Sequence, residues 1–155
     1  MNYMRAIFIV AGWMATACAS AYNLTEFDPR LANSNNSDRV VVTHIWGLSC
    51  ASCVADLPKW SRLAAAHPEI QFKFIESEPA TPEDVLSRLE SVSLARYSNY
   101  YVTHNLTERD QFTVDPAWQG ETPFTLIQYK DKTSYFFGPL SKDSISKILS
   151  FRLEH

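Results

Sequence analysis

Two of the three cysteines of this 155-residue chain lie three positions apart, directly after a short run of apolar, β-branched residues. The stretch reads THIWGLSCASC, from Thr43 to Cys53. The run at residues 39–46 is typical of a strand buried on both faces of a parallel sheet. Residues 53–67 carry apolar side chains at helical spacing. A cysteine pair at such a strand-to-helix junction belongs to a metal site, a structural disulfide or a redox pair.

These three kinds of site place different demands on the chain. Zinc needs two further Cys or His ligands at suitable spacing, whereas the four histidines are scattered singly. A domain of this size needs no structural disulfide in order to fold. A disulfide between residues three positions apart also removes little entropy from the unfolded chain. In a redox pair, helix N-terminal amides stabilise the thiolate of Cys50. Cys53, one turn into the helix, then resolves a mixed disulfide. The redox pair is favoured.

Residues 1–21 are typical of a secretory signal peptide. Arg5 precedes an apolar core from Ala6 to about Ala17, and residues 19–21 (ASA) fit the small-residue cleavage pattern. The core is shorter than the roughly 20 residues that span a bilayer. Cys18 loosely resembles the lipidated cysteine of a bacterial lipobox, which makes a lipid anchor there an alternative. Either way, we expect export to a compartment where disulfides persist.

The rest of the chain is typical of one α/β domain at residues 39–155, preceded by an N-terminal arm at residues 22–38. After the first strand and helix, the sequence predicts a strand, a helix that starts at a Thr81 cap, an irregular aromatic stretch, a hairpin and a last helix. Their ranges are 70–76, 81–92, 94–117, 123–138 and 141–153. Within the aromatic stretch, we expect a helix and a connection, with a short strand as a further element. For residues 96–104, a packed helix is favoured over the lining of a substrate groove. The alternation predicts a sheet with helices on both faces.

Four landmarks in sequence order resemble the thioredoxin superfamily, and within it the exported TlpA/ResA-type thiol–disulfide oxidoreductases. They are the IWGLSCASC segment, Pro58 eight residues past the first cysteine, the WQGETPFTLI segment and the FFGPLSKDSISKIL segment. The resemblance covers about Val40 to Leu153. It implies a thioredoxin-like fold in which helices flank a central mixed sheet, with extra elements between the CxxC helix and the cis-proline strand. It also implies the bacterial periplasm or the extracytoplasmic membrane face as the location.

The resemblance assigns roles to individual residues. Cys50 is the attacking nucleophile and Cys53 the resolving thiol. Pro123, as a cis residue, brings the Thr122 backbone beside the cysteines, where it pairs with an extended client segment.

Two neighbours of the cysteine pair are further candidates for substrate contact. Trp46 belongs to the aromatic opening of the motif, although core packing is its commoner role. Ser49 replaces the tryptophan that usually precedes the first cysteine, which predicts a more open and polar cap over the site.

Two titratable residues are candidates for moving the proton of Cys53. His44 lies six residues before Cys50, where thioredoxin has a buried acid. A neutral imidazole there relays the proton and a charged one favours the thiolate; the alternative is a hydrogen-bonded core histidine. Glu76 resembles in context the acidic residue near the active site of ResA-like proteins. If it is buried, its pKa rises and it accepts the proton; the alternative is a solvated carboxylate at a strand end.

We therefore expect an enzyme that reduces disulfides of client proteins and takes its electrons from a membrane donor, with no cofactor and no bound metal. A disulfide-forming oxidase uses the same residues. A Cu(I)-binding metallochaperone module, with two thiolates and His44 as ligands, is the alternative from another class. The net charge of −3 and the scattered basic residues argue against a nucleic-acid partner.

Overall fold

The computed structural model describes residues 22–32, 38–151 and 153. They form one six-stranded sheet, flanked by four α-helices and a short 3-10 helix. The strands are β1 (Leu24–Glu26), β2 (Val41–Trp46), β3 (Gln71–Pro79), β4 (Ser98–Val102), β5 (Phe124–Tyr129) and β6 (Lys132–Phe137). The helices are η1 (Pro29–Leu31), α1 (Ala51–Ala66), α2 (Pro82–Ser91), α3 (Glu108–Val114) and α4 (Lys142–Ser150). The predicted signal peptide, with Cys18, lies outside the described residues.

The sheet is mixed, as expected, and its strand order is β1-β4-β3-β2-β5-β6. The first four strands in this order run parallel, while β5 and β6 run antiparallel to their neighbours. All six residues of β2 are buried. A strand covered on both faces has no solvated side, and this explains why its sequence is a continuous apolar run rather than an alternating one.

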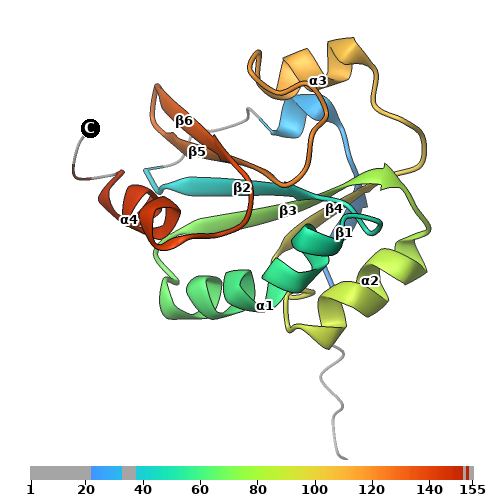
Figure 1. Ribbon diagram of the computed structural model, residues 1–155, viewed down its shortest axis with the longest axis horizontal. Coiled ribbons are helices and arrows are strands. Elements are labelled where there is room, and N and C mark those ends of the chain that lie inside the picture. The colour runs from blue at the N-terminus through green and yellow to red at the C-terminus, as the bar shows by residue number, and fades with distance from the viewer. Residues whose placement is uncertain (1–21, 33–37, 152, 154–155) are drawn as a thin grey trace, which may run out of the picture.

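Helices cover the two faces of the sheet unequally (Figure 1). The helices α1, α2 and α4 lie on one face, and α3 and η1 lie on the other. The larger core lies under α1, α2 and α4 and holds most of the buried aliphatic and aromatic side chains. The smaller core lies under α3 and η1. This is the two-layer burial that an α/β sheet requires.

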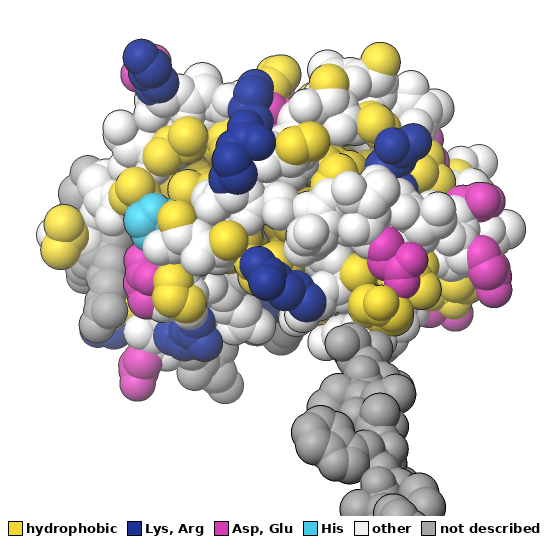
Figure 2. Space-filling view, turned by 90° about the horizontal axis from the view of Figure 1, so that it is seen from below, with side chains coloured by type: hydrophobic (Ala, Val, Ile, Leu, Met, Phe, Trp, Pro, Cys, Tyr) yellow, Lys and Arg dark blue, Asp and Glu magenta, His cyan; other side chains and the backbone are white. Residues whose placement is uncertain are grey.

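The surface over α1 and α2 carries both signs of charge (Figure 2). Lysine, arginine and acidic side chains are scattered among apolar ones, and acidic ones lie toward both ends of this face. The first turn of α2 contains Glu83 and Asp84. None of the helices in the described part of the chain is long and apolar enough to cross a membrane.

Two segments differ from the sequence prediction. The packed helix expected over residues 96–104 is wrong, because this segment contains β4, which pairs with β1 and β3. The buried Asn99 amide donates to three carbonyl oxygens of the preceding turn and fixes the entry into the strand. Short apolar runs do not distinguish helix from strand by periodicity alone. The N-terminal arm contributes β1, which no pattern in its sequence indicated.

The helix that carries the cysteines is tied to the last helix by a buried carboxylate. Asp56 of α1 is 2 % exposed, and its Oδ2 accepts a hydrogen bond of 2.6 Å from the Leu140 amide, just before α4. Its Oδ1 lies 2.8 Å from Lys59 Nζ. Both oxygens therefore have partners, which a buried charge requires.

Candidate active site

The two cysteines form a disulfide at the start of α1, with their Cα atoms 5.2 Å apart. Cys50 is the N-cap residue of the helix, and its Sγ accepts a hydrogen bond of 3.2 Å from the Cys53 amide. Cys53 is fully buried, whereas Cys50 is partly exposed. The sulfur that an approaching molecule meets is therefore that of Cys50.

The surroundings of Cys50 favour a negative charge on its sulfur once the disulfide is reduced. The positive end of the α1 dipole and the Cys53 amide both point to this position. The Ser52 hydroxyl lies 3.4 Å from Cys50 Sγ and can donate to it. Ser52 is the second of the two residues between the cysteines. The dipeptide Ala51-Ser52 does not by itself indicate whether the cysteine pair is reducing or oxidising.

The segment before β5 lies directly against the exposed cysteine. The peptide bond between Thr122 and Pro123 is cis, and the Thr122 carbonyl oxygen lies 3.9 Å from Cys50 Sγ. The Pro123 carbonyl accepts a hydrogen bond of 2.9 Å from the Gly138 amide, just after β6. The positive φ of 86° at Gly138 suits a residue without a Cβ. Thr122 and Cys50, 72 residues apart in sequence, thus share one surface.

The two further candidates for substrate contact have different environments. Ser49 is exposed beside Cys50, and both its amide and its hydroxyl donate to the carboxylate of Glu78. Trp46 is 0 % exposed and packs in the larger core. Its predicted role in substrate contact is corrected to core packing, because its side chain presents no surface to a client.

Glu76 lies inside β3, which continues to Pro79 rather than ending at residue 76, and it pairs with Trp46, the last residue of β2, in the sheet register. Its side chain is fully buried. Its Oε1 accepts hydrogen bonds from the amides of Leu48 and Glu78 at 3.2 and 3.1 Å, and its Oε2 has no partner among the described residues. Burial raises its pKa from 4.5 to about 7, and the negative charge of Glu78 adds to the rise while the two amides oppose it. Of the two sequence alternatives, this is the buried carboxylate.

His44 lies in the middle of β2 and is also fully buried. Its Nδ1 lies 3.0 Å from the hydroxyl oxygen of Thr125 on β5, and its ring packs against Trp60 of α1 with centroids 4.3 Å apart. Nε2 has no partner among the described residues. Desolvation lowers the pKa of His44 to about 3. The imidazole is therefore neutral at physiological pH, and the charged form considered from the sequence does not apply.

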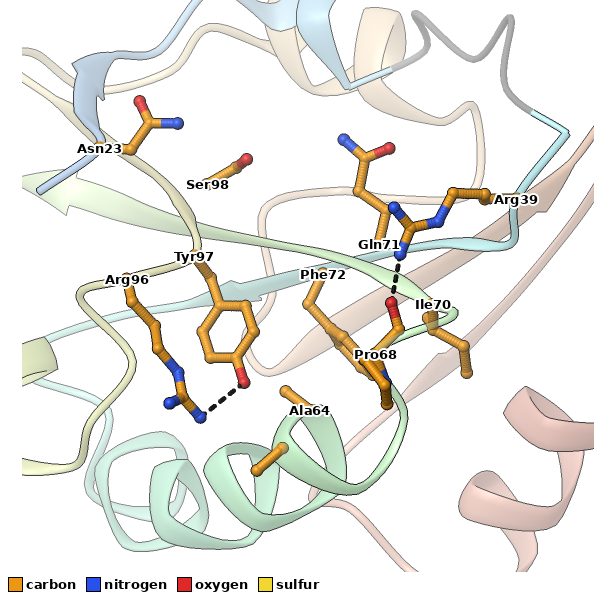
Figure 3. Close-up of a pocket in the computed structure, with 11 residues that line it drawn as sticks. Asn23, Arg39, Ala64, Pro68, Ile70, Gln71, Phe72, Arg96, Tyr97 and Ser98 are labelled. Atoms are coloured by element: carbon orange, nitrogen blue, oxygen red, sulfur yellow. Dashed lines mark hydrogen bonds between the residues drawn. The ribbon is translucent and has the colours of Figure 1, made fainter.

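Hollows in the surface lie both near the cysteines and away from them. One of about 420 Å³ lies between Leu48 and α2 and is lined by Asp84 and Arg88. Another of about 490 Å³ lies at the opposite end of α1 (Figure 3). In this second hollow Arg96 donates to the Tyr97 hydroxyl, and Arg39 donates to backbone carbonyls. Its arginines are thus engaged within the protein.

Within residues 22–32, 38–151 and 153, no three His, Cys, Asp or Glu side chains come together as a metal site. Three polar residues near the cysteines were not among the candidates that the sequence indicated: Ser52, Asp56 and Glu78. A buried Asp56 one turn past Cys53 was detectable from the helical spacing, since it falls on the apolar face. The contacts of Glu78 arise because β3 continues beyond the last residue of its neighbour β2. No local sequence pattern encodes this.

Comparisons with known proteins identify the fold. No protein-family model matches the chain, and no curated protein matches its sequence. A secreted disulfide oxidoreductase of Mycobacterium tuberculosis, homologous to E. coli DsbE, superposes with a TM-score of 0.56 at 21% identity, over 76% of this chain and 82% of that one. A thioredoxin-related protein of Neisseria meningitidis serogroup B gives 0.61 at 15%, over 77% and 88%. StoA of Bacillus subtilis gives 0.53 at 14%, over 74% and 84%.

Each of the three matches about three quarters of this chain and most of the other protein. At such low identities they establish architecture rather than activity. The chain is therefore a protein of the thioredoxin-like fold.

Proposed function

We propose that this protein is an exported thiol–disulfide oxidoreductase that reduces disulfides in client proteins. One observation carries the proposal: a partly exposed Cys50 caps the helix α1 and lies 3.9 Å from the Thr122 carbonyl oxygen. A helix N-terminus activates the sulfur. The carbonyl offers a backbone acceptor to a client segment that lies across the sulfur in an extended conformation.

The reaction begins from the reduced pair. The Cys50 thiolate attacks one sulfur of a client disulfide, which forms a Cys50–client bond and releases the other client sulfur as a thiolate. Cys53, after losing its proton, attacks Cys50 Sγ. This second step breaks the Cys50–client bond, forms the Cys50–Cys53 disulfide and releases the second client thiolate. Two electrons pass to the client, and a membrane electron donor restores the dithiol.

Deprotonation of Cys53 requires an acceptor, because the thiol is buried. Glu76 is our candidate, since its pKa of about 7 lets it take up and release a proton near neutrality. His44 is the second candidate, but only as a relay: its pKa of about 3 prevents it from holding a second proton near neutral pH, so Nε2, which has no partner among the described residues, must accept a proton while Nδ1 releases one. Thr122 and Pro123 serve as the backbone platform for the client, and Ser49 forms the rim beside it.

Export and the reducing direction are inferred from the sequence and its resemblances. The signal-peptide pattern of residues 1–21 favours export, and the similar M. tuberculosis protein is described as secreted. The reducing direction follows from the resemblance to TlpA/ResA-type proteins. Client proteins and a membrane donor are the partners that this function requires, and Cys18 offers a possible lipid anchor.

Two cysteine variants test the mechanism. Cys50→Ser should abolish the reduction of a disulfide in a model protein such as insulin, because no nucleophile remains. Cys53→Ser should instead accumulate mixed disulfides, detectable by mass spectrometry as adducts that dithiothreitol releases. Retained turnover in Cys50→Ser contradicts the proposal.

The reduction potential of the couple, measured against glutathione, tests the direction. A value near that of thioredoxin, about −270 mV, supports a reductase, and a value near that of DsbA, about −120 mV, supports an oxidase.

A further inference from the structure

A second carboxylate from β3 reaches the turn that leads into Cys50. Glu78 Oε2 accepts a hydrogen bond of 2.8 Å from the Ser49 amide, and its Oε1 accepts one of 2.7 Å from the Ser49 hydroxyl. The Glu78 side chain is half-buried. Its carboxylate is therefore bound to the residue directly before the sulfur that a client meets.

Gly47, in the turn before Cys50, lies against the Glu78 carboxylate. A Cβ at Gly47 would lie 2.4 Å from Glu78 Oε1, which is far inside the contact limit. Any side chain at this position displaces the carboxylate from Ser49. The contact between Glu78 and Ser49 therefore depends on a residue without a Cβ at position 47.

Every amide of the turn from Leu48 to Cys50 is engaged. The Leu48 amide donates to Glu76 and the Ser49 amide donates to Glu78. The Cys50 amide donates to the Gly47 carbonyl at 3.2 Å. Two acidic residues of one strand therefore hold the loop, and a charged Glu78 does so through charge-assisted hydrogen bonds, which are roughly twice as strong as neutral ones.

We propose that Glu78 is a positioning residue for Cys50: it fixes the turn before the cysteine and, by its negative charge, opposes formation of the Cys50 thiolate. This inference rests on the proposed function and deepens it. The α1 terminus alone stabilises the thiolate and so stabilises the reduced pair, as in strong oxidants. Glu78 counters that effect, destabilises the dithiol and makes the couple a better reductant.

The central experiment replaces the charge but keeps the shape. Glu78→Gln should lower the pKa of Cys50, measured from the ultraviolet absorbance of the thiolate. It should also shift the equilibrium with glutathione toward the reduced protein by about three- to tenfold, the size expected for one charge several ångströms away at a partly screened site. That change corresponds to a potential about 15 to 30 mV more positive.

Three further variants separate charge from geometry. Gly47→Ala keeps the charge but pushes the carboxylate off Ser49, so it should shift both quantities in the same direction by a smaller amount. Glu78→Asp keeps the charge near the turn and should restore most of the wild-type values. Asp131→Asn removes one charge from the exposed β5–β6 turn and should leave both quantities unchanged. Thermal unfolding of each variant verifies that the fold is retained.

The inference is overturned if Glu78→Gln leaves the Cys50 pKa and the potential unchanged, or if Asp131→Asn shifts them equally. These readouts need only the purified protein and glutathione. If the wild-type protein reduces no protein disulfide, the proposed function is wrong. The effect of Glu78→Gln on the Cys50 pKa and on the potential still tests the role of Glu78 in that case.

Discussion

His44 and Glu76 are both fully buried on neighbouring strands, yet only one of them titrates near neutral pH. Burial disfavours the charged form of each, so the pKa of His44 falls to about 3 and that of Glu76 rises to about 7. His44 is thereby locked neutral across the physiological range. Glu76 changes its charge within it.

The difference follows from the chemistry of the two groups. His44 is a base and lies in mid-strand between Trp60 and Thr125, where one hydroxyl is its only hydrogen-bond partner among the described residues. Glu76 is an acid and lies opposite the last residue of β2, where two backbone amides partly support its charge. Burial favours the neutral form of both groups, which moves the pKa of the base away from neutral pH and that of the acid toward it.

Removing the histidine should give the largest effect. The unfolded chain takes up a proton on His44 near pH 6.5 and the folded chain near pH 3, so wild-type stability falls as the pH falls through this window. Relative to His44→Gln, the wild type should lose about 5 kcal/mol across it. Urea unfolding at several pH values measures this. Parallel stability curves for the two proteins would mean that His44 is not desolvated as described.

Glu76→Gln should give a somewhat smaller effect of opposite sign. The folded chain keeps the proton up to about pH 7 and the unfolded chain only up to about 4.5. Wild-type stability therefore falls as the pH rises through this window, by about 3 kcal/mol relative to the variant. The same unfolding series detects it. A variant that loses stability above pH 7 would show that the charged Glu76 is supported rather than strained.

The smallest effect concerns the single hydroxyl that faces His44. Thr125→Val keeps the shape but leaves His44 Nδ1 without a partner, which should cost about 1 to 2 kcal/mol in unfolding free energy. Thr43→Val on the neighbouring strand is the matched control. The buried Thr43 hydroxyl has no hydrogen-bond partner among the described residues, so its loss should cost little. Equal losses in both variants would assign no special role to the His44–Thr125 contact.

The sequence predicted the parts of the fold that local chemistry encodes. The apolar run of β2, the Thr81 cap of α2 and the Ser141 cap of α4 all carry their signals within a few residues. The segment containing β4 does not, because its aromatic residues suit a helix and a strand equally, and its partner β1 is a strand of three residues.

Of the site, the sequence predicted the cysteine pair and the proline that lies against it. The spacing of Cys50 and Cys53 is local, and the resemblance placed Pro123 against them. Glu78 is different, because its contacts join the end of one strand to a turn 29 residues earlier in the sequence. Likewise, the burial of Trp46 follows from helices that pack over β2 from distant parts of the chain.

The bond between Asp56 and the Leu140 amide has a consequence for the order in which this protein is made. The two residues are 84 positions apart, so the helix bearing the cysteines receives this anchor only after all six strands of the sheet have been synthesised. A nascent chain that ends before residue 140 already contains both thiols but leaves a buried carboxylate without its amide partner. The reactive pair thus exists before the support that holds its helix in place.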